Sequence, residues 1–218
     1  MFRIFVAAAA AFLLSACAFG DAKLKVAYDA NAAKAGVLSE AASARINVTD
    51  VKDLREEKNA IGYKRNGFGM KTADILSEKP APELVKEALI ATLEKNGHKI
   101  DATEERFVIN TNLKKFWFDY KTGFVSVEFY ANIQAEISVV DQQSGQTIYS
   151  EVFDGYHSEK TGGGLSKTWT RIMNVALADF ANKVNLSTGF KDALASVAAA
   201  QATPAVSANS AGDATTGS

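Results

Sequence analysis

This 218-residue chain has few cysteines and histidines, a net charge close to zero and few long apolar runs. The single cysteine, Cys17, excludes a disulfide framework and a metal site built from several cysteines. The two histidines, His98 and His157, lack the H-x-x-x-H or His-carboxylate spacing of metal and proton-transfer sites, so we expect surface or end-of-element histidines and no metal. A formal net charge of -1 leaves no basic field for nucleic acid.

The N-terminal stretch has the pattern of a secretory signal. A basic start, Met1-Phe2-Arg3, precedes an apolar run from Ile4 to Leu14. This run is shorter than the roughly 20 apolar residues that span a bilayer. Leu14-Ser15-Ala16-Cys17 then resembles the lipobox of bacterial lipoproteins at every position. The resemblance implies that residues 1–16 are removed and that Cys17 carries a diacylglycerol and an N-acyl chain, with no other cofactor.

The residue after the cysteine bears on which membrane holds the anchor. In lipoproteins with this motif, Asp at that position tends to retain the protein in the inner membrane, and here the position is Ala18. We therefore expect the periplasmic face of the outer membrane. Stable anchoring takes two membrane signals, which the implied acyl chains exceed, so attachment is expected to be permanent.

Composition divides the remaining chain into three parts. Residues 17–44 are rich in Ala and Lys, which predicts a tether with an optional edge strand at 24–28. Residues 45–195 carry the periodic patterns of one folded α+β domain. Residues 196–218 have almost no bulky apolar side chain, so we expect a disordered tail.

The first half of the domain predicts a strand and a helix. Ile46 and Val48 alternate with polar residues in a strand over 45–51, and a glycine-punctuated loop follows. Pro80 and Pro82 introduce a helix that Gly97 ends in a left-handed conformation. One face of this helix is expected to be buried; it comprises Leu84, Val85, Ala88, Leu89, Thr92 and Leu93.

Three strands and a second helix follow. The strand over 106–118 changes its apolar phase after Leu113, which predicts a bulge. The strand over 125–139 alternates apolar and polar residues without a break, which is typical of an antiparallel strand with one buried face. A third strand covers 147–153. Beyond the glycines at 162–164, Ser166 is a candidate cap for a helix whose apolar stripe is Leu165, Trp169, Ile172, Met173, Ala176, Phe180 and Val184.

The predicted order is therefore β-α-β-β-β-α. A sheet with one apolar face needs a cover, and two amphipathic helices supply it. The sequence predicts a two-layer α+β sandwich with a mainly antiparallel sheet and both helices on one face.

The chain resembles the YajG-like lipoproteins of Gram-negative bacteria. The resemblance rests on the lipobox, on Val51-Lys52-Asp53-Leu54-Arg55, on Ile61-Gly62 and on the helix ending in Leu93-Glu94-Lys95-Asn96-Gly97, and it covers residues 1–195. It implies an outer-membrane lipoprotein and supplies no catalytic residues. The Ala/Ser-rich tail departs from the family pattern.

Two further motifs are candidate binding sites: a glycine-rich segment at 161–168 and the pair Asp53 and Arg55. The segment 161–168 superficially matches a phosphate loop, but Thr161 and Ser166 occupy the positions of both diagnostic glycines, so we expect no nucleotide binding. Asp53 and Arg55 lie two residues apart at a strand end. A structural ion pair is the simpler interpretation, and a polar ligand site is the alternative.

The best candidate for function is a cluster of aromatic residues around the turn at 119–123. Such residues are enriched at interface centres, and exposed apolar patches mark contacts with partners or membranes. Alternatively, they wrap onto the sheet and close the core. The cluster comprises Phe116, Trp117, Phe118, Tyr120 and Phe124. The polar face of the next strand, with Tyr130, Asn132 and Gln134, is a second possible docking surface.

We therefore expect a lipid-anchored, non-enzymatic protein that docks a protein partner in the cell envelope. The alternative is a lipid- or small-ligand-binding accessory module of envelope lipid transport. An apolar cavity between sheet and helices would favour the alternative, and a filled core would favour docking. An enzyme is the least favoured class, since no cluster of perturbed titratable groups can be assembled from these motifs.

Overall fold

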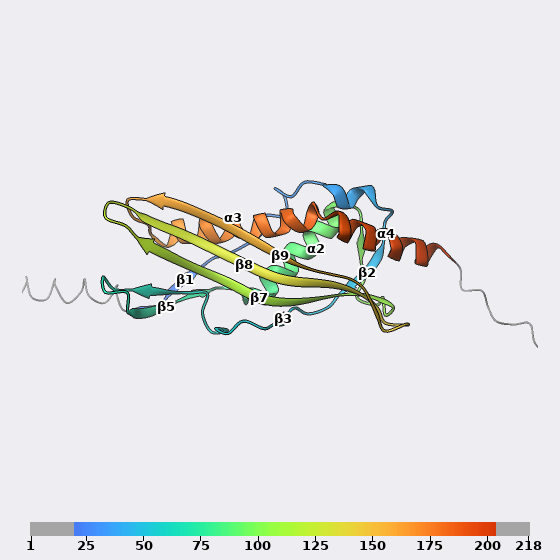
Figure 1. The fold of residues 1–218 in the computed structure, drawn as a ribbon, viewed down its shortest axis with the longest axis horizontal. Helices are drawn as coiled ribbons and strands as arrows, with labels where there is room; N and C mark the ends of the chain where they lie inside the picture. Colours follow the sequence, from blue (N-terminus) through green and yellow to red (C-terminus); the bar gives the residue numbers. More distant parts are fainter. Residues whose placement is uncertain (1–19, 204–218) are drawn as a thin grey trace, which may run out of the picture.

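Three long antiparallel strands form the frame of the fold (Figure 1). They are β7 (Phe107–Thr122), β8 (Val127–Asp141) and β9 (Gln146–Thr161). This computed structural model describes residues 20–203. The predicted signal at 1–16, the lipid attachment at Cys17 and residues 204–218 of the predicted tail lie outside the described residues.

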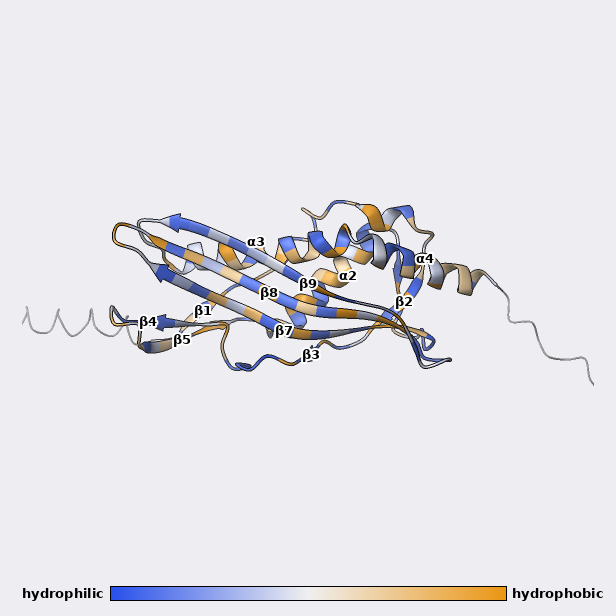
Figure 2. Ribbon diagram, in the orientation of Figure 1, coloured by the Kyte–Doolittle hydropathy of each residue, from blue (hydrophilic) through white to orange (hydrophobic). Residues whose placement is uncertain are grey.

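The alternation predicted for 125–139 is confirmed from Phe129 onward, but Val125 precedes β8 and is 83% exposed rather than buried. The inward side chains of β8 from Phe129 to Val139 are all buried, while the intervening residues are partly exposed. The banding is visible along the strands in Figure 2. The predicted bulge is also confirmed, because the β7–β8 register shifts between Leu113 and Lys115. The third strand is longer than predicted and continues to Thr161.

The other edge of β7 pairs with three short strands in succession, all parallel to it. These are β2 (Arg45–Val48), β3 (Lys52–Asp53) and β4 (Gly62–Arg65). The prediction of a mainly antiparallel sheet is therefore only partly correct. The physical reason is connectivity: a helix crosses over between β2 and β7, and such a crossover joins parallel strands.

Further short strands extend this edge into a nine-stranded sheet. The segment predicted as a loop contains a hairpin, in which β5 (Lys71–Ser77) lies antiparallel to β4. β1 (Ala22–Leu24) lies parallel to β5, and β6 (Lys99–Ile100) lies parallel to β2. The predicted order β-α-β-β-β-α thus omits several strands.

Within residues 20–203, three α-helices accompany the sheet: α2 (Ala81–Lys95), α3 (Ser166–Asn185) and α4 (Thr188–Ala202). The buried face predicted for α2 is confirmed, and Gly97 has the expected positive φ of 87°. In α3, Ile172, Met173, Ala176, Phe180 and Val184 are buried as predicted. The stripe does not include Leu165, which is 80% exposed, and Ser166 is the first helical residue rather than the cap.

The contact between sheet and helices is filled by apolar side chains. Ile133 and Ile137 of β8 have no exposed surface, and neither have Leu84 of α2 and Phe180 of α3. At Gly155, β9 approaches α3 so closely that an added Cβ would lie 2.3 Å from the carbonyl oxygen of Ala176. Figure 1 shows α2 and α3 behind the long strands.

Both predicted flexible segments are more ordered than expected. The predicted tether packs against the domain through the buried side chains of Leu24, Val26 and Leu38, and its short helix η1 spans Val37–Glu40. The tail was predicted to start at residue 196, but α4 continues to Ala202. The apolar face of α4 uses small residues, Val197 and Ala198, which a search for bulky side chains overlooks.

Candidate functional site

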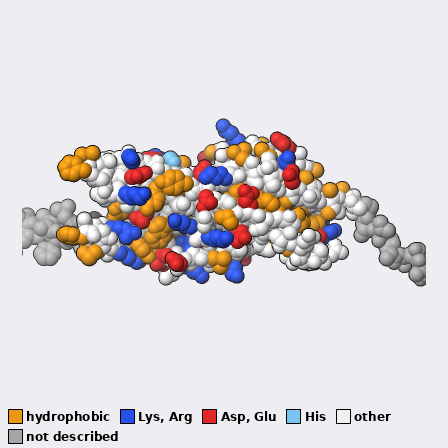
Figure 3. Space-filling model, viewed as in Figure 1, with side chains coloured by type: hydrophobic (Ala, Val, Ile, Leu, Met, Phe, Trp, Pro, Cys, Tyr) orange, Lys and Arg blue, Asp and Glu red, His pale blue; other side chains and the backbone are white. Residues whose placement is uncertain are grey.

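Helices α2 and α3 pack on one face of the long strands, and the opposite face is turned to solvent. Figure 3 looks onto this outer face and shows hydrophobic side chains gathered near its middle, with Lys, Arg, Asp and Glu around them. Because strand side chains alternate, the outer face carries the residues between the core positions, including Trp117 of β7 and Tyr130 of β8.

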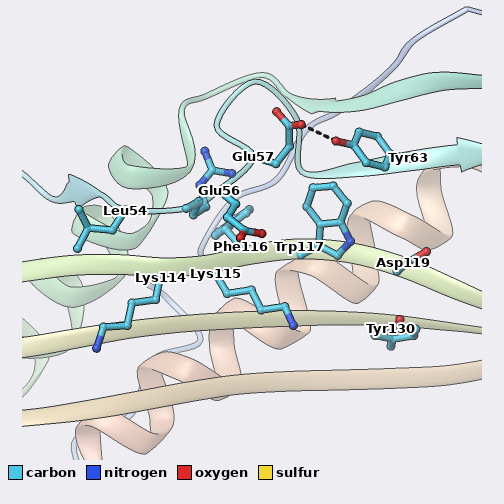
Figure 4. Close-up of a pocket in the computed structure, with 11 residues that line it drawn as sticks. Leu54, Glu56, Glu57, Tyr63, Lys114, Lys115, Phe116, Trp117, Asp119 and Tyr130 are labelled. Atoms are coloured by element: carbon cyan, nitrogen blue, oxygen red, sulfur yellow. Dashed lines mark hydrogen bonds between the residues drawn. The ribbon is translucent and has the colours of Figure 1, made fainter. Parts of the chain in front are cut away.

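A groove of about 740 Å³ crosses this outer face. Its walls come from the loop after β3 and from β4, β7 and β8. The lining residues are Leu54, Arg55, Glu56, Glu57, Tyr63, Lys114, Lys115, Phe116, Trp117, Asp119 and Tyr130. Figure 4 shows Leu54 and Glu56 on one border and Lys114 and Lys115 on the other.

Tyr63 and Trp117 form the aromatic centre of the groove. Their rings meet edge to face, with 4.9 Å between centroids and an interplanar angle of 82°. The Tyr63 hydroxyl donates a hydrogen bond of 2.5 Å to Glu57 Oε2, drawn in Figure 4. Lys71 Nζ lies 4.0 Å from the centroid of the Tyr63 ring, within cation–π range. These contacts fix the orientation of both rings before any ligand arrives.

Charge surrounds this centre on several sides. The hydrogen bond from Tyr63 lowers the pKa of Glu57 and raises the pKa of the Tyr63 phenol. Burial, followed by the Asp119 carboxylate, raises the pKa of Tyr130. Glu57 is therefore ionised and both phenols are neutral at neutral pH. A half-buried aromatic centre with fixed charges of both signs suits a protein segment that has apolar and charged side chains.

Asp53 and Arg55 form an ion pair, as the simpler interpretation predicted. Arg55 Nη2 lies 2.8 Å from Asp53 Oδ2, and the Arg55 side chain is 6% exposed. The same guanidinium donates to the carbonyl oxygens of Lys58 and Ala60. Its donors are thus directed at the local backbone, and the pair shapes the loop that forms one wall of the groove.

We expect Asp53→Asn to lower the free energy of unfolding by about 1–2 kcal/mol at pH 7. Burial raises the pKa of Asp53, but the hydrogen bonds from Arg55 outweigh it and hold the pKa below its ordinary value of 3.8. A lowered folded-state pKa stabilises the fold above the unfolded-state pKa of about 3.9, and this stabilisation is lost as the pH falls through the folded-state value.

Urea unfolding of both proteins between pH 7 and pH 2 measures this difference. The two stabilities should converge at the acidic end of that range. Asp50→Asn is the control. It removes the partner of Lys86, but it should change the free energy of unfolding little, because the Asp50 side chain is 99% exposed. A constant difference between Asp53→Asn and wild type at every pH would contradict the assignment.

The predicted aromatic cluster is divided between core and surface. Phe116 and Phe118 are buried, so for them the alternative of core closure is correct. Trp117 points to the outer face, and Tyr120 binds the backbone of Arg65 through its hydroxyl. Phe124 lies fully exposed at the tip of the β7–β8 hairpin. Only Phe116 and Trp117 of this cluster line the groove.

The sequence prediction missed Tyr63 and Glu57. Both lie in a stretch predicted as loop, and a four-residue strand is too short for a reliable period. Tyr130, from the second predicted surface, does line the groove, whereas Asn132 and Gln134 do not belong to its lining. Of the two histidines, His98 lies just after the end of α2, as an end-of-element histidine, but it is buried against the carbonyl of Leu38 rather than on the surface. His157 contacts Glu159.

Comparison with known proteins places the chain among lipoproteins. A family model, Lipoprotein_16, described as uncharacterized lipoprotein, matches residues 33–188. In the described part of the chain, 20–203, no helix is long and apolar enough to cross a membrane. The curated proteins contain no significant match to the sequence.

One solved structure shares the fold at low sequence identity, and a second is similar more distantly. A protein of Xanthomonas campestris, of family DUF330, superposes with a TM-score of 0.54 at 11% identity, covering 79% of this chain and 94% of that one. A minor lipoprotein of Acinetobacter baumannii has a TM-score of 0.41 at 9% identity, covering 66% of this chain and 90% of its own.

Proposed function

The chain belongs to the Lipoprotein_16 family of uncharacterized lipoproteins, and we propose that it is a non-enzymatic docking factor of the cell envelope, held by lipid on Cys17. The membrane is the outer membrane and the protein faces the periplasm, an address that Ala18 supports. Among lipoproteins, the chain is related to the YajG-like group. The geometry of that group's motif supports this: Asp53 binds Arg55, and a Cβ at Gly62 would lie 2.4 Å from the Phe118 carbonyl oxygen.

The observation that carries the proposal is the uncovered outer face with its aromatic groove. Trp117 and Tyr63 are ordered by each other and by Glu57, yet they remain accessible from solvent. Preordered aromatic side chains bind partners at low entropic cost. The filled contact between sheet and helices supports docking at this surface rather than a lipid-carrying interior.

Trp117→Ala is expected to weaken partner binding by about 30-fold or more, the effect of losing an interface hot spot of at least 2 kcal/mol. The unfolding midpoint should change little by comparison, because the indole lies on the outer face. Tyr156→Ala is the matched control, since Tyr156 is 47% exposed on β9 and does not line the groove.

The measurement is co-purification of the lipidated protein from membranes, with identification and quantification of the bound proteins and lipids. Loss of the partner with both variants would indicate a general effect on the face rather than on the groove. Recovery of lipid without any protein partner would favour the lipid-binding alternative.

The anchor has its own test. Cys17→Ser is expected to abolish incorporation of radioactive palmitate and to release the protein from the membrane fraction, because the acyl chains provide the attachment. Incorporation equal to that of wild type would refute the assignment of Cys17.

A further inference from the structure

Three loops meet at one end of the molecule, the left end of Figure 1. They are 66–70 between β4 and β5, 123–126 between β7 and β8, and 162–165 before α3. The register places them together. β4 runs parallel to β7 with Gly62 beside Phe118, so both strands reach their tips at the same level. Val127 pairs with Thr161, which brings the third loop to the same end. We call these three loops the apolar end.

The apolar end carries the most exposed large apolar side chains of the described residues. Their exposed fractions run from 60% to 104%, whereas the other exposed large apolar side chains in residues 20–203 reach only 38% to 52%. The five are Phe68, Met70, Phe124, Val125 and Leu165. Figure 3 shows hydrophobic side chains at the outermost points of this end. Five apolar side chains presented together mark a contact surface.

The opposite end of the molecule shows that exposed tips need not be apolar in this fold. The β8–β9 hairpin turns through Gln-Gln-Ser-Gly at 142–145. The loop before β7 reads Asp-Ala-Thr-Glu-Glu at 101–105. Both are polar, and the second is acidic. The distribution of apolar tips is therefore asymmetric along the long axis.

Charge has the same asymmetry. The three segments of the apolar end with their flanks, 64–71, 120–127 and 160–168, contain basic residues and no Asp or Glu. The basic residues are Lys64, Arg65, Lys71, Lys121, Lys160 and Lys167. Of these, Arg65 is paired with Asp119 and Lys71 with Asp74, so the charge available at the tips comes from the four other lysines. Apolar side chains surrounded by lysines match the interface of an anionic bilayer, where rings enter the acyl boundary and ammonium groups meet phosphates.

The chain from Cys17 also arrives at this end. The Gly20 carbonyl oxygen accepts a hydrogen bond of 2.6 Å from Lys64 Nζ, next to the 66–70 loop. Two residues, Ala18 and Phe19, separate Gly20 from Cys17. The three Cα–Cα steps limit the distance between them to about 11 Å. Because β1 is parallel to β5, the chain followed toward its N-terminus leads toward the start of β5, where that loop lies.

We propose that the apolar end is a membrane-docking surface that inserts its tips into the anionic bilayer to which Cys17 is anchored. This proposal rests on the lipid anchor of the proposed function. The lipid fixes the protein at the membrane, and the three loops fix its orientation. The C-terminal end of α4 then points away from the bilayer (Figure 1). The groove at Trp117, which lies on the outer face of the long strands, faces sideways into the periplasm.

The test uses the full, lipidated chain in vesicles of phosphatidylethanolamine and phosphatidylglycerol with brominated acyl chains. Val125→Cys and Gln143→Cys each introduce one thiol for a fluorescent label, since lipid occupies Cys17. Bromine is expected to quench most of the label at residue 125, at a depth of about 5–10 Å, and to leave the label at 143 unchanged.

A second variant tests whether quenching depends on the apolar tips rather than on the label itself. Adding Phe68→Ser and Phe124→Ser to Val125→Cys should abolish quenching without unfolding, because these side chains are 90% and 104% exposed. Protein that sediments with vesicles through its lipid while residue 125 stays unquenched would overturn the docking surface and leave the anchor intact. Protein without lipid on Cys17 would overturn both. A label shielded in the absence of vesicles, together with a dimeric mass, would assign the surface to a second copy and also overturn it.

Discussion

Gly155→Ala is expected to lower the free energy of unfolding by about 3 kcal/mol or more. The added Cβ would lie 2.3 Å from the Ala176 carbonyl oxygen and 2.6 Å from Phe180 Cβ. The first of these atoms is backbone and the second is a Cβ fixed to it, so the clash is relieved only if α3 moves off the sheet. Such a movement would open the filled contact around Met173 and Phe180.

Urea unfolding measures this effect as a lower midpoint. Gly163→Ala is the matched control, because nothing lies within 4 Å of a Cβ there. It should change the midpoint little. Equal stability of the two variants would contradict the close approach of β9 and α3 on which the two-layer fold depends.

Phe118→Ala is expected to cost about 3–5 kcal/mol of stability. Phe118 has no exposed surface and packs against Phe129 and Trp169, with ring centroids 6.0 Å and 5.5 Å away. The surrounding strand and helix cannot collapse into the space of a whole ring, so a cavity remains.

The neighbouring residue provides the comparison. Trp117 lies on the other face of the same strand, so Trp117→Ala should cost clearly less stability than Phe118→Ala while it disrupts the groove. Thermal or urea unfolding of both variants in parallel gives the answer. A larger stability loss for Trp117→Ala would mean that β7 faces the other way and that the groove is part of the core.

Side-chain periodicity predicts much of this fold. The unbroken alternation in 125–139 and the helical stripe from Ile172 to Val184 each need many residues to bury one face, so their patterns are unambiguous. The phase change after Leu113 predicts the bulge for the same reason, because a one-residue shift would otherwise turn apolar side chains outward.

The short parallel strands leave no such pattern. Lys52–Asp53 contains only two residues, and its position is set by its pairing with Asn112 and Leu113 of β7. The groove depends on the same tertiary register. Periodicity alone could assign Trp117 to the face opposite Phe116 and Phe118, but its contact with Tyr63 exists only because β4 docks beside Phe118.

The apolar end illustrates a further limit. The aromatic residues around 119–123 suggested one cluster in the sequence, yet their side chains serve the core, the groove and the loop tip separately. Phe124 is joined instead by Phe68 and Leu165. These residues come from three distant segments, and only the assembled strands bring them to one end.

Site-specific photocrosslinking from the groove of the lipidated protein in its own cells tests the docking role most directly. A photoreactive residue in place of Lys115, which lines the groove and is exposed, should give a discrete adduct with one envelope protein. That adduct should disappear with Trp117→Ala and persist with Tyr156→Ala. Absence of any adduct, or an adduct that persists with Trp117→Ala, would contradict docking through this groove.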